Sequence, residues 1–137
     1  MRHATIYAWI FLALDVYGRN SPASLDKIIS AADALNKDIP SHTDLQAAIG
    51  WLTQEGLIHR QERRYGFTQL GIDLMAEVKS QTTSPFDGWD FLEKRFANAA
   101  SPIELADISE LEWQRAYDTY NHRMTKLTGV KRSNNSP

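Results

Sequence analysis

Apolar and polar residues recur with a helical period along the first part of the chain. Between residues 5 and 17 the apolar positions fall at i, i+3, i+4, i+7, i+8 and i+11, which is one face of an amphipathic helix. The members of this stripe are Ile6, Trp9, Ile10, Ala13, Leu14 and Tyr17. A second stripe begins near Ser24 and comprises Leu25, Ile28, Ile29, Ala32 and Leu35. The pattern predicts two helices, the first ending at Gly18 and the second before Pro40.

A third helix is expected between Ser41 and Gly56. Ser41 is a preferred N-cap residue, and Asp44, three positions on, comes close to a capping box although it is shorter than the usual Glu. The buried stripe of this helix consists of Leu45, Ala48, Ile49 and Leu52. Gly56 is typical of the position that ends a helix, so the element is expected to stop there.

A β-hairpin and a fourth helix are predicted next. Residues 57–60 and 65–68 have the composition of two short strands around a polar, charged tip. Thr68 is expected to cap a helix over about 69–79, with Leu70, Leu74 and Val78 turned inward. The predicted fold class is mainly α with a small β-hairpin.

The remainder of the chain is expected to form an appendage. The stretch SQTTSP at 80–85 contains no core residue and is interpreted as a linker. Two further helices are predicted over about 86–99 and 109–127, and the polar end, GVKRSNNSP, is expected to be disordered. The predicted organisation is a domain at 1–79, the linker at 80–85, a helical appendage at 86–128 and a disordered tail at 129–137.

Composition limits the classes of protein to consider. The 137 residues carry a net charge of −2, so the molecule as a whole does not attract nucleic acid. Cysteine is absent, which excludes disulfides and thiolate chemistry and favours a cytoplasmic location. The apolar run at 4–14 resembles a short signal peptide, but Asp15 follows it without a cleavage site, and the run is too short to span a bilayer. The preferred interpretation is a first helix, and no membrane association is predicted.

Catalytic motifs do not emerge from the sequence. The four histidines are scattered, and the triplet His42-Thr43-Asp44 is better explained as a helix N-terminus than as a metal site. Asp87, Asp90 and Glu93 lie in the first turns of a predicted helix, where the helix dipole favours acidic residues. We therefore predict no catalytic residue, no metal site and no cofactor, and expect that the protein is not an enzyme.

Two segments carry a resemblance to a known class of protein. AAIGWLTQEGLI, followed by YGFTQLGIDLM, is similar to the signature of the MarR-like and PadR-like bacterial regulators, with Phe67-Thr68 and Gly71 at its second part. AADALNKDIPSHTDL also resembles uncharacterised bacterial winged-helix proteins. Over residues 5–79 the chain thus resembles a winged helix-turn-helix domain. The two predicted C-terminal helices follow this domain. The resemblance implies a dimeric, DNA-binding transcriptional regulator.

The same resemblance implies which residues would contact DNA. Projected at 100° per residue, the third helix turns Thr43, Ala47, Gly50 and Gln54 outward, flanked by Asp44, Gln46 and Trp51. The expected base contacts are Thr43, Gln46, Ala47 and Gln54. The hairpin tip would supply the phosphate contacts Arg60, Arg63 and Arg64.

Charge argues against this hypothesis. Residues 24–55 hold two lysines and five acidic residues, a net charge of −3, and the third helix has no Lys or Arg. Attraction to phosphate supplies most non-specific DNA affinity, so this deficit is a handicap. The alternative is a helix whose face, formed by Ala47, Gly50 and Trp51, packs against protein. A winged-helix protein-interaction module without DNA binding is therefore the second hypothesis, and both DNA and a protein remain candidate partners.

The appendage offers a possible dimer contact. Trp113, Tyr117, Tyr120, Met124 and Leu127 follow one another at spacings of 4, 3, 4 and 3, which form one seam along a helix. This seam is the expected homodimer interface. The alternative is that both C-terminal helices fold back over the first helix and complete its core. A pocket for a small effector between the appendage and the core is also left open.

Overall fold

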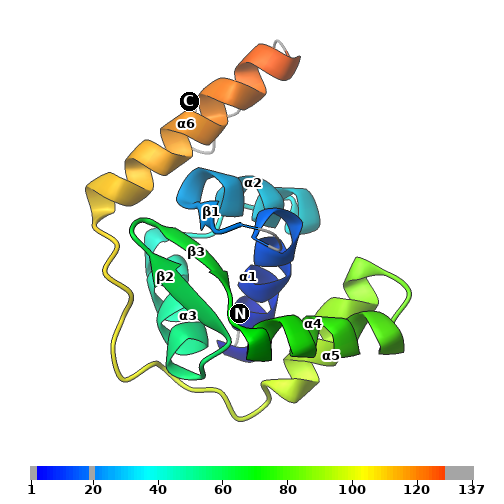
Figure 1. Ribbon diagram of the computed structural model, residues 1–137. Coiled ribbons are helices and arrows are strands. Elements are labelled where there is room, and N and C mark those ends of the chain that lie inside the picture. The colour runs from blue at the N-terminus through cyan, green and yellow to red at the C-terminus, as the bar shows by residue number, and fades with distance from the viewer. Residues whose placement is uncertain (1–2, 19–20, 129–137) are drawn as a thin grey trace.

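The computed structural model describes residues 3–18 and 21–128. Their elements follow in the order shown in Figure 1: α1 (His3–Tyr17), β1 (Ala23–Ser24), α2 (Leu25–Asn36), α3 (His42–Gln54), β2 (Ile58–Gln61), β3 (Arg64–Phe67), α4 (Gln69–Gln81), α5 (Pro85–Arg95) and α6 (Glu110–Thr128). This part of the chain is mainly helical with a small antiparallel sheet, as the sequence predicts at that coarse level. The tail at 129–137, predicted to be disordered, lies outside the described residues.

The sheet contains a strand that the sequence pattern misses. β3 lies between β1 and β2 and pairs with both of them in the antiparallel direction. β1 pairs Ala23 with Tyr65 and Ser24 with Arg64, whereas the sequence predicts a turn and the start of a helix at these positions. Two residues are too few to produce the alternating apolar pattern by which a strand is recognised.

α1 lies at the centre of the core rather than at its edge. Its side chains from Tyr7 to Leu14 are all buried, because α2, α3 and α5 each pack against it. The single apolar stripe expected from the sequence therefore underestimates its burial. Tyr17, expected on the buried side, is exposed, and the Lys27 ammonium lies 5.0 Å from the centroid of its ring.

α3 and α4 begin at the N-cap residues that the sequence predicts, Ser41 and Thr68. The Ser41 hydroxyl accepts the amide hydrogen of Asp44 at 3.0 Å, and the Thr68 hydroxyl accepts that of Gly71 at 3.1 Å. These bonds satisfy amide groups that the first turn of a helix leaves without partners. Within α4, Leu74 and Val78 are buried as expected, whereas Leu70 is exposed, because Gly71 occupies the position closest to the hairpin.

α5 ends earlier than the sequence predicts. The predicted helix runs to Ala99, but α5 ends at Arg95, and residues 96–109 contain neither helix nor strand. At this point the Phe96 ring inserts edge-on against Trp51 and Phe11, with centroid separations of 4.9 and 6.1 Å. Burial of this ring supplies a reason for the helix to stop. The predicted linker also shortens to residues 82–84, since α4 and α5 each take part of it.

The C-terminal helices share the core of the preceding elements. Leu92, Phe96, Ile108 and Tyr120 belong to the same buried cluster as the residues of α1, α2 and α3. α5 packs on α1, and α6 lies along α2, as Figure 1 shows. The described appendage therefore folds back onto its own chain, although α6 covers α2 rather than the first helix. Among residues 3–18 and 21–128, no helix combines the length and apolarity needed to cross a bilayer.

Candidate interaction surface on α3 and the hairpin

The inner side of α3 packs against the core. Leu45, Ala48, Ile49 and Leu52 are buried, as the sequence predicts. Trp51, expected beside the outward face, is also buried, stacked on Tyr7 with ring centroids 5.0 Å apart. Ala47 packs against the same core. Protein therefore closes both the inner side of α3 and the flank that carries Ala47 and Trp51.

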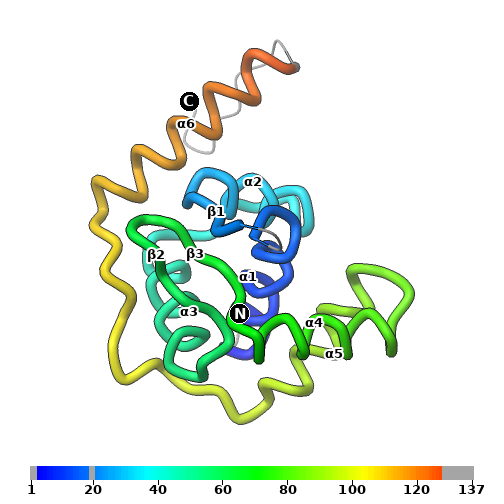
Figure 2. Tube along the Cα trace, viewed as in Figure 1, coloured from blue at the N-terminus to red at the C-terminus, as the bar shows by residue number. Residues whose placement is uncertain are grey.

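The outward side of α3 is covered by an extended segment from the C-terminal part of the chain. We call residues 103–108 the strap. Figure 2 shows the connection between α5 and α6, drawn in yellow, passing along α3 on its way to α6. The Ala106 amide donates to the Gln46 backbone carbonyl at 3.0 Å, and the Ile103 amide donates to Oε1 of Gln54 at 2.8 Å. The strap is thus bonded to α3 near both of its ends.

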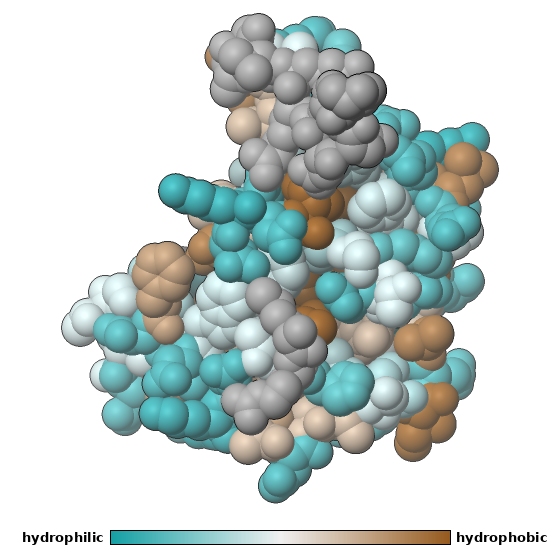
Figure 3. Space-filling view, turned by 180° about the vertical axis from the view of Figure 1, so that it is seen from behind, coloured by the Kyte–Doolittle hydropathy of each residue, from teal (hydrophilic) through white to brown (hydrophobic). Residues whose placement is uncertain are grey.

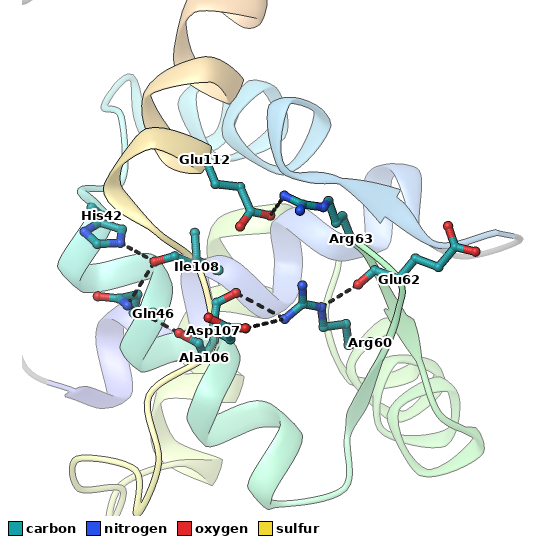
Figure 4. A network of polar contacts seen from close by, with 9 residues as sticks. All are labelled: His42, Gln46, Arg60, Glu62, Arg63, Ala106, Asp107, Ile108 and Glu112. Carbon is teal, nitrogen blue, oxygen red and sulfur yellow. Dashed lines mark hydrogen bonds and ion pairs between the residues drawn. The ribbon is translucent and has the colours of Figure 1, made fainter.

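Side chains of α3 complete this backbone recognition. Nε2 of Gln46 donates to the carbonyls of Ala106 and Ile108 at 3.3 and 3.0 Å. Nε2 of His42 also bonds to the Ile108 carbonyl, which can only accept, so this ring nitrogen carries the proton. In Figure 4 His42 and Gln46 both point at the Ile108 carbonyl. These hydrogen bonds are made to the main chain of the strap and not to its side chains.

Gly50 allows the strap to approach α3 closely. A Cβ atom at this position would lie 2.5 Å from the Glu104 carbonyl oxygen and 3.1 Å from the Ala106 nitrogen. The first distance is too short for a carbon atom and the second is tight, so any side chain at residue 50 would push the strap backbone away. Because Gly50 has no side chain, the Ala106 amide can also come close enough to donate to the Gln46 carbonyl.

Two hairpin arginines contact the strap and the start of α6. Nη1 of Arg60 donates to the Asp107 carbonyl at 3.1 Å and lies 3.9 Å from the Asp107 carboxylate. Nη1 of Arg63 lies 3.6 Å from the Glu112 carboxylate. Figure 4 shows both guanidinium groups turned toward these acidic residues. Arg64 is exposed on β3.

A cavity of about 430 Å³ lies between α3, the hairpin and the strap, lined among others by Gly50, Arg60 and Tyr65. Tyr65 is buried, and its hydroxyl has no hydrogen-bond partner within the described part of the chain. Burial raises the pKa of this hydroxyl, with the nearby charges of Arg60 and Glu112 acting in opposite directions. The hydroxyl therefore remains neutral at physiological pH.

The predicted base-contact residues do not share one open surface. Gln46 and Gln54 bond to the strap, Ala47 packs against the core, and Thr43 is exposed. Of the predicted phosphate contacts, Arg60 and Arg63 face acidic partners within the chain. From the sequence, His42 is interpreted only as part of a helix N-terminus and the strap is not predicted, although a glycine on the outward face of α3 is a signal that backbone could approach there.

The predicted dimer seam lies on α2 of the same chain. Tyr120 is buried and its hydroxyl donates to the Asp33 carboxylate, while Nε1 of Trp113 donates to the Pro40 carbonyl at 3.1 Å. Tyr117 stacks on Trp113, and Met124 is half-buried against the core. Leu127 is exposed. The aromatic part of the seam therefore has a partner within the chain, and the homodimer stays a prediction.

Other regions offer less defined chemistry. Among the described residues, no group of three or more His, Asp or Glu side chains is arranged to hold a metal ion. A groove of about 690 Å³ runs between the end of α3, α4 and the residues after α5, with Trp51 and Phe96 among its lining residues and Glu77 and Arg95 at its edge. This groove lies between appendage and core, where the sequence leaves a pocket for a small effector open as an alternative.

Comparisons of the chain with family models, curated proteins and solved structures give no match. A function must therefore be inferred from the surfaces themselves. On the face shown in Figure 3, hydrophobic residues are scattered among hydrophilic ones. The α3 and hairpin side instead gathers His42, Gln46, Gly50 and Arg60 around one extended segment, with Arg63 beside them facing Glu112 at the start of α6. We call these five residues the α3–hairpin surface.

Proposed function

We propose that this chain is a protein-interaction module built on a winged-helix scaffold, and that the α3–hairpin surface is its binding surface. The observation that carries the proposal is the strap itself, an extended protein segment held by hydrogen bonds to its backbone along α3. A surface that already accommodates protein backbone in this way has the chemistry of a peptide-binding site.

The scaffold assignment rests on the order of the elements. Three helices, a hairpin and a fourth helix follow one another, as in the winged-helix domains that the sequence resembles. β1, between α1 and α2, joins the hairpin as a third strand and ties it to the helices. A fold alone does not define a function, so the scaffold serves here only to place α3 and the hairpin side by side.

Electrostatics supports a protein partner over DNA. Residues 24–55 carry a net charge of −3, and the strap adds Glu104 and Asp107 beside them. DNA approaching α3 would meet these carboxylates before any base-reading side chain, and repulsion would oppose the phosphate contacts on which affinity depends. Gln46 and Gln54 are in addition engaged with the strap.

A DNA-binding regulator acting as a dimer is the second candidate. The observation in its favour is the hairpin at 59–64, which holds three arginines against one glutamate, a net charge of +2. In this alternative the strap would have to leave α3 before the helix could enter a major groove. Arg60 and Arg63 would then exchange their acidic partners for phosphates.

Titration of a fluorescently labelled random duplex at low salt separates the two candidates. Under our proposal the full chain gives little anisotropy change, and R60A/R63A/R64A gives the same result as the wild type. A control variant removes three exposed cations elsewhere: Lys94, Arg115 and Lys126, each replaced by Ala. Wild-type binding that weakens steeply with salt, disappears in the hairpin variant and persists in the control would overturn the proposal in favour of DNA.

A further inference from the structure

We infer that the α3–hairpin surface binds an extended acidic segment of a partner protein, and that the strap occupies the surface as the chain's own version of that ligand. This inference rests on the proposed function and adds the chemistry of the partner. The strap shows which features of a segment the surface recognises.

The first feature is an extended backbone. The Ala106 amide and the carbonyls of Ala106 and Ile108 all bond to α3, through Gln46 and His42. None of these bonds involves a strap side chain, so another sequence in the same extended conformation would satisfy them equally. A helical segment could not, because its own hydrogen bonds occupy these groups.

The second feature is a small residue where the segment crosses Gly50. A Cβ on residue 50 would lie 2.5 Å from the Glu104 carbonyl oxygen, 3.1 Å from the Ala106 nitrogen and 3.3 Å from the Leu105 Cα, so the crossing spans residues 104–106. Glu104 and Leu105 are exposed, whereas Ala106 has a small side chain and is half-buried. A partner segment should therefore carry Ala, Gly or Ser at the position of Ala106.

The third feature is negative charge beside the hairpin. Asp107 follows the crossing residue and meets Arg60 through both its carbonyl and its carboxylate. Arg63 lies next along the hairpin and faces the Glu112 carboxylate of α6. A partner with a carboxylate directly after its small residue would place a negative charge against Arg60, where a neutral or basic segment would not.

The strap is held weakly enough to be exchanged. Ile103 is 91% exposed and Leu105 is 56% exposed, so both apolar side chains point away from α3. The Asp107 side chain is 98% exposed, and ion pairs in such positions add little to stability. Within the strap, Ile108 is the fully buried apolar side chain. Segments with few buried apolar contacts are those that open locally most often.

A polyanion such as DNA fits the same surface less well. Phosphate oxygens accept from Arg60, Gln46 and His42, but they have no N–H group to donate to the Gln46 backbone carbonyl, which now accepts from the Ala106 amide. The crossing at Gly50 is likewise a feature of close backbone contact. Peptide is therefore the ligand that uses the whole surface, and DNA is a possible outcome of the test.

The probe is a fluorescein-labelled peptide with the sequence of residues 101–109, SPIELADIS, titrated against the full chain. A strap variant, A106E/D107K, weakens the binding of the strap, which competes with the peptide, and leaves the five residues of the α3–hairpin surface unchanged. We expect this variant to bind the peptide at least about tenfold more tightly than the wild type does, because the tethered strap competes at high effective concentration. Adding Gly50→Ala to the variant should reverse the gain, whereas adding Thr43→Ala, at an exposed position of α3 away from the cavity, should preserve it.

Controls make each outcome decisive. Circular dichroism and thermal melting verify that the variants fold, and Asp107→Lys alone serves if the double variant does not. A scrambled peptide of the same composition should bind at least about tenfold more weakly. Equal binding of the scrambled peptide, no binding to either folded strap variant, or insensitivity to Gly50→Ala would each overturn the inference. If the strap variant instead binds random duplex DNA, the proposed function fails as well; if it binds neither probe, only the inference fails.

Discussion

The inner and outer sides of α3 are held by different kinds of contact. On the inner side Leu45, Ile49 and Leu52 are buried among the side chains of the core. On the outer side the strap contributes hydrogen bonds to its backbone and an exposed carboxylate facing Arg60. Apolar packing is lost only when the core comes apart, whereas hydrogen bonds at a surface can be exchanged for bonds to water or to another chain. Under the proposed function, one side of the helix maintains the fold and the other exchanges partners.

Truncating an inner residue should have the largest effect on stability. Leu52→Ala removes a fully buried side chain and leaves a cavity, so the free energy of unfolding should fall by roughly 2–5 kcal/mol. Gln46→Ala, on the outer side, removes two hydrogen bonds to the strap and should cost only about 1 kcal/mol. Urea denaturation of both variants measures the difference. Equal losses would contradict the division of α3 into a structural and an exchangeable side.

Gly50→Ala tests the outer side by adding an atom. Displacement of the strap should lower the free energy of unfolding by about 1–3 kcal/mol, since overpacking is relieved by moving an exposed segment. Hydrogen exchange measured by NMR should show the Ala106 amide losing its protection, while amides in the core of α1 keep theirs. Thr43→Ala, at an exposed position of the same helix, is the control. Retained protection at Ala106 would mean that the strap tolerates the added methyl group.

Acid should weaken the contact between α6 and the start of α2, where Arg123 pairs with Asp26. Burial raises the pKa of Asp26, but the hydrogen bonds from Ser24 and Arg123 and the Arg123 charge outweigh it, so the pKa lies below the ordinary value of 3.8. Asp26 is therefore protonated less readily in the folded chain, and the stability it contributes above pH 3.8 is lost as the pH falls through the folded-state pKa. Urea denaturation at about pH 6 and about pH 3 should show this loss, and Asp26→Asn should diminish it. An unchanged pH dependence in that variant would assign the effect to other carboxylates.

Removing a hairpin charge should have the smallest effect. The Arg63 side chain is largely exposed and lies 3.6 Å from the Glu112 carboxylate, so Arg63→Ala should change the free energy of unfolding by less than about 1 kcal/mol. The same substitution should change the salt dependence of ligand binding if the hairpin meets acidic partners. A stability loss as large as that of Leu52→Ala would show that the hairpin belongs to the structural part of the molecule.

The sequence predicted the elements whose signals are local. Helical periods and the capping residues Ser41 and Thr68 located α3 and α4 within a few residues, because each signal depends only on neighbours in the chain. The sequence missed β1, whose two residues become a strand only through pairing with Tyr65 and Arg64. Pairing between strands depends on tertiary structure, so it leaves little trace in the hydrophobic pattern of the sequence.

The surface of α3 was harder to predict. A helical projection gives the direction of each side chain, but it does not say what covers that direction. Trp51 projects beside the outward face and is nevertheless buried, because Phe96 reaches it from the end of α5. The strap has no periodicity of its own, so its contact with α3 could have been suspected only from Gly50 and from acidic residues that match the hairpin arginines.

The strap is fixed at both ends, and this governs how it can move. Phe96 holds one end in the core, and α6, packed on α2, holds the other. A segment released from α3 would therefore bulge outward as a closed loop instead of swinging away as a free tail. The entropy gained by release is limited by these anchors, and loops of about this length reclose in roughly 10–100 ns. Under the proposed function, a partner would have to bind the exposed side of α3 during such an opening or replace the strap one residue at a time.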